Sequence, residues 1–244
     1  GDEWLRAKGT TLCADNDIDM ALMLGVLASD NIKHPPLECL FTTDEETGLT
    51  GAFALSNDML TGDVLINLDS EDDGEIFVGC AGGIDTTATF NYETKKTPKG
   101  YFAFSVSVSG LSGGHSGDDI DKHRANANKL LNRILWNMLR DMDLRLVKID
   151  GGNLRNAIPR EASATACVPY KEKENVRVIF NRVVSDIEEE FQNIETKMRI
   201  ELHSDETPKE TLTKKSTRKL LNALYACPHG IKKMSMDMPG LVET

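Results

Sequence analysis

The chain has 244 residues, enough for one large domain or two smaller ones, and its 40% hydrophobic and 27% charged residues are typical of a soluble globular protein. The net charge of −11, without a basic stripe, argues against nucleic acid as a partner. No apolar run is long enough to cross a membrane, and the first residues do not resemble a signal peptide. Five cysteines without a CxxC pair favour a reducing compartment, so we expect a cytoplasmic protein.

The first third of the chain is predicted to alternate helices and strands. Apolar residues at helical spacing predict a helix over residues 18–27. Two apolar runs, residues 37–41 and 63–68, predict buried strands, and both end in a cluster of acids. A helix is expected to begin within residues 51–55. This is the α/β pattern in which sites gather beyond the carboxyl ends of parallel strands.

Downstream of Gly82 the pattern changes to half-exposed antiparallel strands and amphipathic helices. The order strand, helix, strand, strand, helix, strand is that of a ferredoxin-like sandwich. We therefore predict an α/β domain over residues 1–83 and an α+β ferredoxin-like domain over residues 84–244. The predicted strands are 86–92, 101–109, 144–149, 162–168 and 198–202, and the predicted helices are 125–139, 175–194 and 212–225.

Acidic side chains gather where the strands of the first domain are expected to end. Asp15, Glu45, Glu46 and Asp69 occupy these positions. Several carboxylates close together repel one another unless a cation binds them, and divalent ions take such oxygen ligands. Of two adjacent glutamates, one can ligate a metal while its neighbour removes a proton from water. The alternatives are a solvated acidic loop and, for Asp15, a helix N-cap.

With these motifs the sequence resembles the M20 metallopeptidases and, more narrowly, the aminoacyl-histidine (Xaa-His) dipeptidases. The resemblance runs through nearly the whole chain with its motifs in the same order. The segments that carry it are residues 9–16, 41–48, 67–72, 79–83, 113–117, 126–131 and 151–162.

The resemblance implies a binuclear zinc site in the first domain, which would then be part of a zinc-peptidase-like α/β catalytic domain. Asp15 would bridge two zinc ions, while Glu46 and Asp69 would each hold one of them. Glu45 would be the general base that activates the attacking water.

For the second domain the resemblance implies a lid that also forms a homodimer. His115 would bind the substrate or stabilise the tetrahedral intermediate, and Asn156 and Arg160 would hold the substrate's carboxylate end. From the residues alone, His115 could equally be an exposed loop histidine, Asn156 a turn former and Arg160 a surface charge.

The sequence departs from the family in two respects. The zinc-binding histidines of the family are missing, since no histidine precedes His34 and none matches the ligand near the family's C-terminus. We therefore expect an internal piece of a longer enzyme, inactive by itself. Beside the expected bridging ligand, Cys13, Asp17 and Asp19 replace residues that are usually glycine in the family, which could lower or alter activity.

The expected function is zinc-dependent hydrolysis of Xaa-His and related unblocked dipeptides by a cytoplasmic homodimer. Two alternatives stay open. One is another M20 activity, such as that of a tripeptidase, deacylase or desuccinylase. The other is a catalytically inactive homologue or fragment that serves in association.

Overall fold

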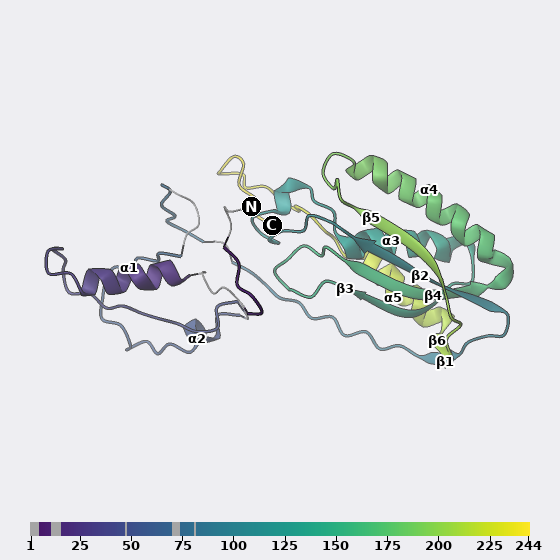
Figure 1. The fold of residues 1–244 in the computed structure, drawn as a ribbon, viewed down its shortest axis with the longest axis horizontal. Helices are drawn as coiled ribbons and strands as arrows, with labels where there is room; N and C mark the ends of the chain where they lie inside the picture. Colours follow the sequence, from purple (N-terminus) through teal and green to yellow (C-terminus); the bar gives the residue numbers. More distant parts are fainter. Residues whose placement is uncertain (1–4, 11–15, 47, 70–73, 81) are drawn as a thin grey trace. The chain divides into compact units, whose positions relative to one another are not determined.

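The structure is a computed structural model of the 244-residue chain. It describes residues 5–10, 16–46, 48–69, 74–80 and 82–244. The chain divides into two compact units, Gly1–Gly82 and Gly83–Thr244, which Figure 1 shows together and which we describe separately.

The described residues of the first unit contain two helices, α1 (Asp17–Leu27) and α2 (Thr50–Phe53). The helix predicted over residues 18–27 is thereby confirmed, and its N-cap is Asn16, whose side chain accepts a hydrogen bond from the backbone N–H of Asp19. The strands predicted over residues 37–41 and 63–68 are wrong for this structure, because neither segment pairs with a neighbour in the described part of the unit.

The second of these segments forms no strand because no neighbouring segment covers it, as its exposure shows. Val64 and Leu65 are each 81% exposed, and Ile66 is 74% exposed. A strand is stable only when a neighbour accepts and donates its backbone hydrogen bonds and covers its apolar side chains. The described residues of this unit provide neither, so an apolar run is not enough to form a ladder.

The second unit is built on a four-stranded antiparallel sheet. Its strands lie in the order β3-β4-β2-β5, and two helices, α3 and α4, connect β2 to β3 and β4 to β5. This is the ferredoxin-like order predicted from the sequence. The elements are β2 (Tyr101–Ser109), α3 (Ala127–Asp141), β3 (Arg145–Gly151), β4 (Ala162–Pro169), α4 (Lys173–Phe191) and β5 (Arg199–Asp205).

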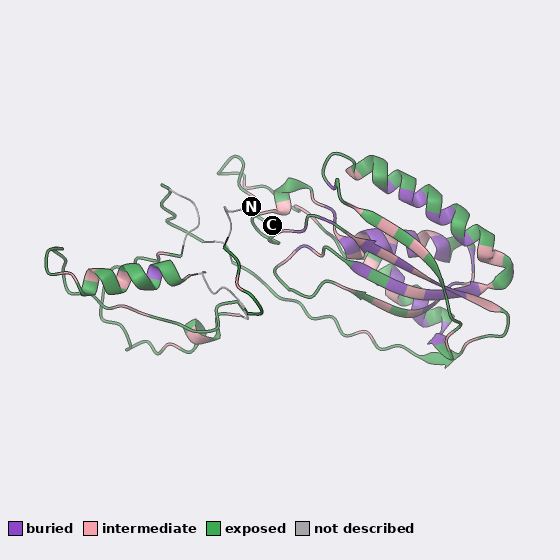
Figure 2. Cartoon of the chain, viewed as in Figure 1, coloured by how far each residue is buried: buried purple, intermediate pink, exposed green. Residues whose placement is uncertain are grey.

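The core lies between the sheet and its helices, and Figure 2 shows buried residues concentrated there. Alternate residues of β2, including Phe104, Val106 and Val108, point into it, as the period-two pattern predicts. Helix α3 packs directly on β2 and β4 and presents Leu131, Ile134 and other apolar residues to the same core. Each fully buried leucine or isoleucine contributes about 1.5–3 kcal/mol, so this layer dominates the stability of the unit.

Shorter elements complete the second unit. The strand predicted over residues 86–92 is absent, and β1 (Thr94–Lys96) instead pairs with β6 (Glu210–Leu212). Helix α5 (Lys214–Ala226) packs against α3. Two short 3-10 helices, η1 (Ile120–Lys122) and η2 (Tyr170–Glu172), lie in the connections. No helix in the described ranges combines the length and apolar character needed to cross a membrane.

Candidate functional site

The predicted base and one predicted metal ligand lie in a closed turn that we call the acidic turn (residues 43–46 and 48–51). The backbone N–H of Gly51 donates to the carbonyl oxygen of Thr43 at 3.1 Å, and a Cβ on Gly51 would lie 2.5 Å from that oxygen, so only glycine fits. The carbonyl oxygen of Glu45 accepts two backbone N–H groups at 3.1 Å. Within this turn the residues Glu45 and Glu46 are both exposed.

The third predicted carboxylate, Asp69, contacts the start of α1. The Nδ2 amide of Asn16 donates to Oδ1 of Asp69 at 2.9 Å and also donates to the carboxylate of Asp19, which is 8% exposed. The predicted bridging ligand Asp15 lies outside the described residues. Its chain neighbour Asn16 nevertheless joins the Asp69 segment to α1, and Asp19 takes part in this contact.

Carboxylate oxygens are ligands that suit a divalent cation. The residue types present therefore fit the zinc or related ion that the resemblance implies. Within the described ranges, no three histidine, cysteine or acidic side chains are grouped so as to hold a metal ion. The roles of Glu46 and Asp69 as ligands and of Glu45 as base therefore stay predictions.

The structure brings the predicted substrate-binding residues together. We call residues 112–125 the His115 loop and residues 151–161 the Asn156 turn. His115 and Ala157 form an antiparallel bridge, in which the backbone N–H of Ser116 donates to the carbonyl of Asn156 at 2.8 Å. On the other side, the N–H of Ile158 donates to the carbonyl of Gly114 at 2.8 Å. An isolated antiparallel bridge thus joins two segments far apart in the sequence at His115.

The ring of His115 is oriented by its own loop. Its Nδ1 atom accepts backbone N–H groups from Gly117 at 3.1 Å and from Asp118 at 3.2 Å. An atom that accepts two hydrogen bonds carries no proton, so the neutral ring has its proton on Nε2. Asp118 lies 3.5 Å from the same Nδ1 atom, but its side chain is 91% exposed, so solvent makes this contact weaker than the two backbone hydrogen bonds. His115 is half exposed and offers its Nε2–H as a donor.

Asp119 fixes the backbone of the His115 loop. Its carboxylate accepts the N–H of His115 at 2.7 Å and forms ion pairs with Lys122 and Arg124. Arg124 also donates to the carbonyl of Gly113 at 2.7 Å. The hydrogen bonds from Lys122 and from the His115 backbone hold the pKa of Asp119 below its usual value.

Arg160 links the Asn156 turn to the beginning of the His115 loop. Its Nε donates to the carbonyl of Leu111 at 3.2 Å, and its stem lies where a Cβ on Gly113 would be, 2.3 Å from Cγ. Among the residues that the structure describes, Arg160 forms no ion pair, and Asn156 is exposed. Both side chains are accessible to a ligand beside His115.

Comparison with known proteins places these features in a family. Residues 99–195 match the model of the M20 peptidase dimerisation domain. The chain is 43% identical to the cytosol non-specific dipeptidase of Escherichia coli K12, a match that covers 99% of this chain and 50% of that protein. The crystal structure of the aminoacylhistidine dipeptidase of Vibrio alginolyticus is similar, with 45% identity and a TM-score of 0.76 over 99% of this chain and 49% of that one. The chain thus contains a match to the M20 dimerisation domain and is similar to dipeptidases over 99% of its length. It spans about half the length of these two relatives.

The match to the M20 dimerisation domain runs from just before β2 to just after α4. It therefore includes His115, Asn156 and Arg160, the residues predicted to contact the substrate. Sequence reasoning missed Asp119 and Arg124, although both are charged residues close to the glycine-rich run. Their signal was weak, because a charge next to glycines is most often a solvated loop residue.

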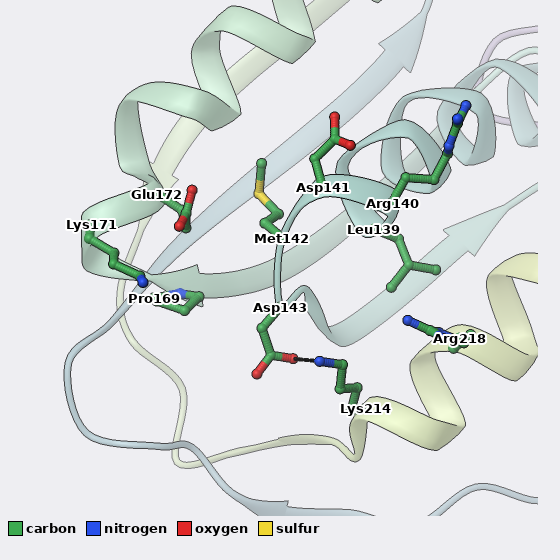
Figure 3. A pocket seen from close by; sticks show the side chains of 10 residues that line it. All are labelled: Leu139, Arg140, Asp141, Met142, Asp143, Pro169, Lys171, Glu172, Lys214 and Arg218. Carbon is green, nitrogen blue, oxygen red and sulfur yellow. Dashed lines mark ion pairs between the residues drawn. The ribbon is translucent and has the colours of Figure 1, made fainter.

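A cavity of the second unit lies far from His115. It measures about 340 Å³ and lies beside the C-terminal end of α3 (Figure 3). There Lys214 forms an ion pair with Asp143 at 3.5 Å, and Arg218 lines the same wall. Helix α3 begins next to the His115 loop and has 15 residues, so about 22 Å of helix separates the two places. The cavity is therefore not part of the His115 site.

Proposed function

We propose that the protein is a metal-dependent dipeptidase that hydrolyses Xaa-His and other unblocked dipeptides. The observation that carries the proposal is the 43% identity to a cytosol non-specific dipeptidase across 99% of this chain, since this span includes every predicted site residue. Residues 1–83 would belong to the catalytic domain and residues 84–244 would form the lid.

The metal site is assigned to the acids of the first unit. Asp15 would bridge two zinc ions, with Glu46 and Asp69 each holding one, and the remaining ligands would come from residues outside this set. Bound zinc would polarise the scissile carbonyl and lower the pKa of water towards neutrality. Glu45 lies beside the ligand Glu46 and would take the proton from the attacking water. It would then pass this proton to the leaving amine.

The lid would bind the peptide and its developing charge. The Nε2–H of His115 would donate to the carbonyl oxygen as negative charge forms on it, because the backbone contacts at Nδ1 keep the proton on the other nitrogen. Arg160, which forms no ion pair within the described residues, would bind the terminal carboxylate of the dipeptide. Asn156 would donate its side-chain amide to the same carboxylate.

Hydrolysis assays combined with metal analysis test this proposal. The protein expressed from its complete reading frame should cleave β-Ala-His and Gly-His and contain about two zinc ions per chain. Glu45→Gln should abolish turnover while the metal content stays unchanged. Glu75→Gln is the matched control, since Glu75 is an exposed glutamate of the same unit. Loss of metal without loss of activity in Glu45→Gln would refute the role given to Glu45.

Assays on the same purified protein distinguish the dipeptidase from the alternative functions. A tripeptide, an N-acyl amino acid and an N-succinyl substrate should each be turned over more slowly than the dipeptides. Faster turnover of one of them would identify a different M20 activity. Absence of bound metal would instead favour a protein that serves only in association.

We further propose that the lid forms a homodimer and that the protein acts in the cytoplasm. The match to a peptidase dimerisation domain supports the first proposal. The word cytosol in the name of the Escherichia coli relative supports the second. For the homodimer, we expect a solution mass of twice the chain mass. A monomer at micromolar concentration would contradict the proposed homodimer.

A further inference from the structure

Glu195 is a buried acidic residue that none of the proposed catalytic roles uses. It is 3% exposed, and both of its carboxylate oxygens are occupied by backbone N–H groups of the His115 loop. Oε2 accepts the N–H of Ser112 at 2.7 Å, and Oε1 accepts the N–H of Ala125 at 3.0 Å. Ser112 and Ala125 are the first and last residues of the His115 loop. One carboxylate therefore joins the two ends of the loop.

The segment that carries Glu195 is itself fixed. The N–H of Glu195 donates to the carbonyl of Phe191 at the end of α4 at 2.9 Å, and its own carbonyl accepts the N–H of Met198 at 3.0 Å. Gly110 packs against this turn so closely that a Cβ would lie 2.1 Å from the carbonyl oxygen of Lys197. The turn thus contacts Gly110, just before the His115 loop, and Ser112 at its start.

Glu195 forms no ion pair within the described part of the chain, and its two carboxylate oxygens accept backbone N–H groups of the loop. A buried carboxylate without a cation is costly, and a neutral apolar residue would fill the same space at lower cost. What an apolar residue cannot do is accept two N–H groups from chain segments that approach from different directions.

Glu195 adds a connection at the two ends of the loop to the contacts that Asp119 and the Asn156 turn make within it. Between Ser112 and His115 the chain has only Gly113 and Gly114, which restrict the backbone least. Holding Ser112 and Ala125 in place removes conformations of the intervening loop and narrows the positions that the His115 ring can occupy.

We propose that Glu195 is a positioning residue for His115. It closes the His115 loop at both ends and thereby holds the Nε2–H donor where the substrate carbonyl is bound. This inference rests on the proposed function only for the role of His115 in hydrolysis. The closure of the loop is independent of that function.

Glu195→Gln is the central test, because the amide keeps the shape but replaces one acceptor with a donor that faces a backbone N–H. The matched control is Glu189→Gln, an exposed glutamate on α4. In the protein expressed from its complete reading frame, we expect amide hydrogen exchange of residues 112–125 to become about tenfold faster, with no change in α4 or in the sheet. The control should exchange as the unaltered protein does.

Kinetics then separate positioning from general stability. We expect Glu195→Gln to lower kcat for β-Ala-His about tenfold with little change in KM or zinc content, because the donor is used mainly in the transition state. In a His115→Ala background the same change should cause no further loss, since Glu195 acts through His115. An additive loss in the double variant would overturn the proposal.

A second variant covers the case in which Glu195→Gln does not fold. Gly110→Ala leaves Glu195 intact but pushes its turn away from Ser112, so it should give the same local increase in exchange. Unchanged exchange over residues 112–125 in the variants that fold would overturn the proposal. If the protein hydrolyses no dipeptide, the proposed function fails, and the exchange measurement still decides whether Glu195 closes the loop.

Discussion

Gly113 offers the sharpest test of how the His115 loop is held. Its φ of +66° lies in the left-handed region, where a side chain costs about 1–2 kcal/mol. In addition, a Cβ at this position would lie 2.3 Å from Cγ and 2.6 Å from Cδ of Arg160. These are middle atoms of the side chain, so the stem of Arg160 must move and give up its hydrogen bond to Leu111.

Gly100 supplies a matched control on the same unit. Its φ of +76° imposes the same backbone cost, but a Cβ there would meet no atom within 4 Å. We expect Gly100→Ala to lower the free energy of unfolding by about 1–2 kcal/mol. Gly113→Ala adds the cost of overpacking, about 1–3 kcal/mol, so its total loss should be about 2–5 kcal/mol.

Urea unfolding followed by circular dichroism measures both losses, and the difference between the two variants isolates the contact with Arg160. Because Arg160 is proposed to bind the substrate carboxylate, Gly113→Ala should also raise KM for dipeptides, whereas Gly100→Ala should not. Equal stability and equal KM in the two variants would refute the reasoning.

Three further predictions follow from single contacts. Thr217→Val removes the hydroxyl that accepts the buried N–H of Leu146 at 3.0 Å and should cost about 1–3 kcal/mol in urea unfolding. Thr165→Val on β4, where the side chain forms no hydrogen bond with another described residue, should be nearly neutral. Asp119 has a lowered pKa, so the stability that it contributes is present above its unfolded value of about 4 and is lost as the pH falls through its folded value. The amide NMR shift of His115 should follow this step, and Asp119→Asn should abolish it. Burial raises the pKa of Cys167 to about 11, so a thiol reagent at pH 8 should label exposed Cys227 in minutes and Cys167 only after unfolding.

The ferredoxin-like unit could be predicted because its signals are local and agree with one another. In β2, alternating Phe104, Val106 and Val108 fix which face is buried, and the spacing of Leu131 and Ile134 in α3 fixes the opposing face. Asn126, at the start of α3, caps it by accepting the N–H groups of Asn128 and Lys129. The hydrophobic pattern, the helix cap and the observed burial all indicate the same fold, although β2 pairs with β4 and β5 much further along the chain.

The errors arise where structure depends on a partner that the local pattern does not contain. Residues 63–68 have the composition of a buried strand, yet the described residues provide no neighbour for them. Conversely, Thr94–Lys96 is polar and lies outside every predicted strand, but it pairs with Glu210–Leu212 far along the chain. Pairing between distant segments is a tertiary property, so the strand pattern predicts where a strand could form and not whether it does.

The distinction between local patterns and contacts of distant segments also explains which residues of the candidate site the sequence reveals. His115, Asn156 and Arg160 stand in glycine-rich turns that a family resemblance makes visible. Glu195 was passed over because a glutamate just after a helix is usually solvated. Only the folded chain shows that its two oxygens meet the backbone at both ends of the His115 loop. A residue that positions a site through backbone contacts cannot be recognised from the sequence of the loop that it holds. Any loop residue except proline supplies the same backbone N–H group.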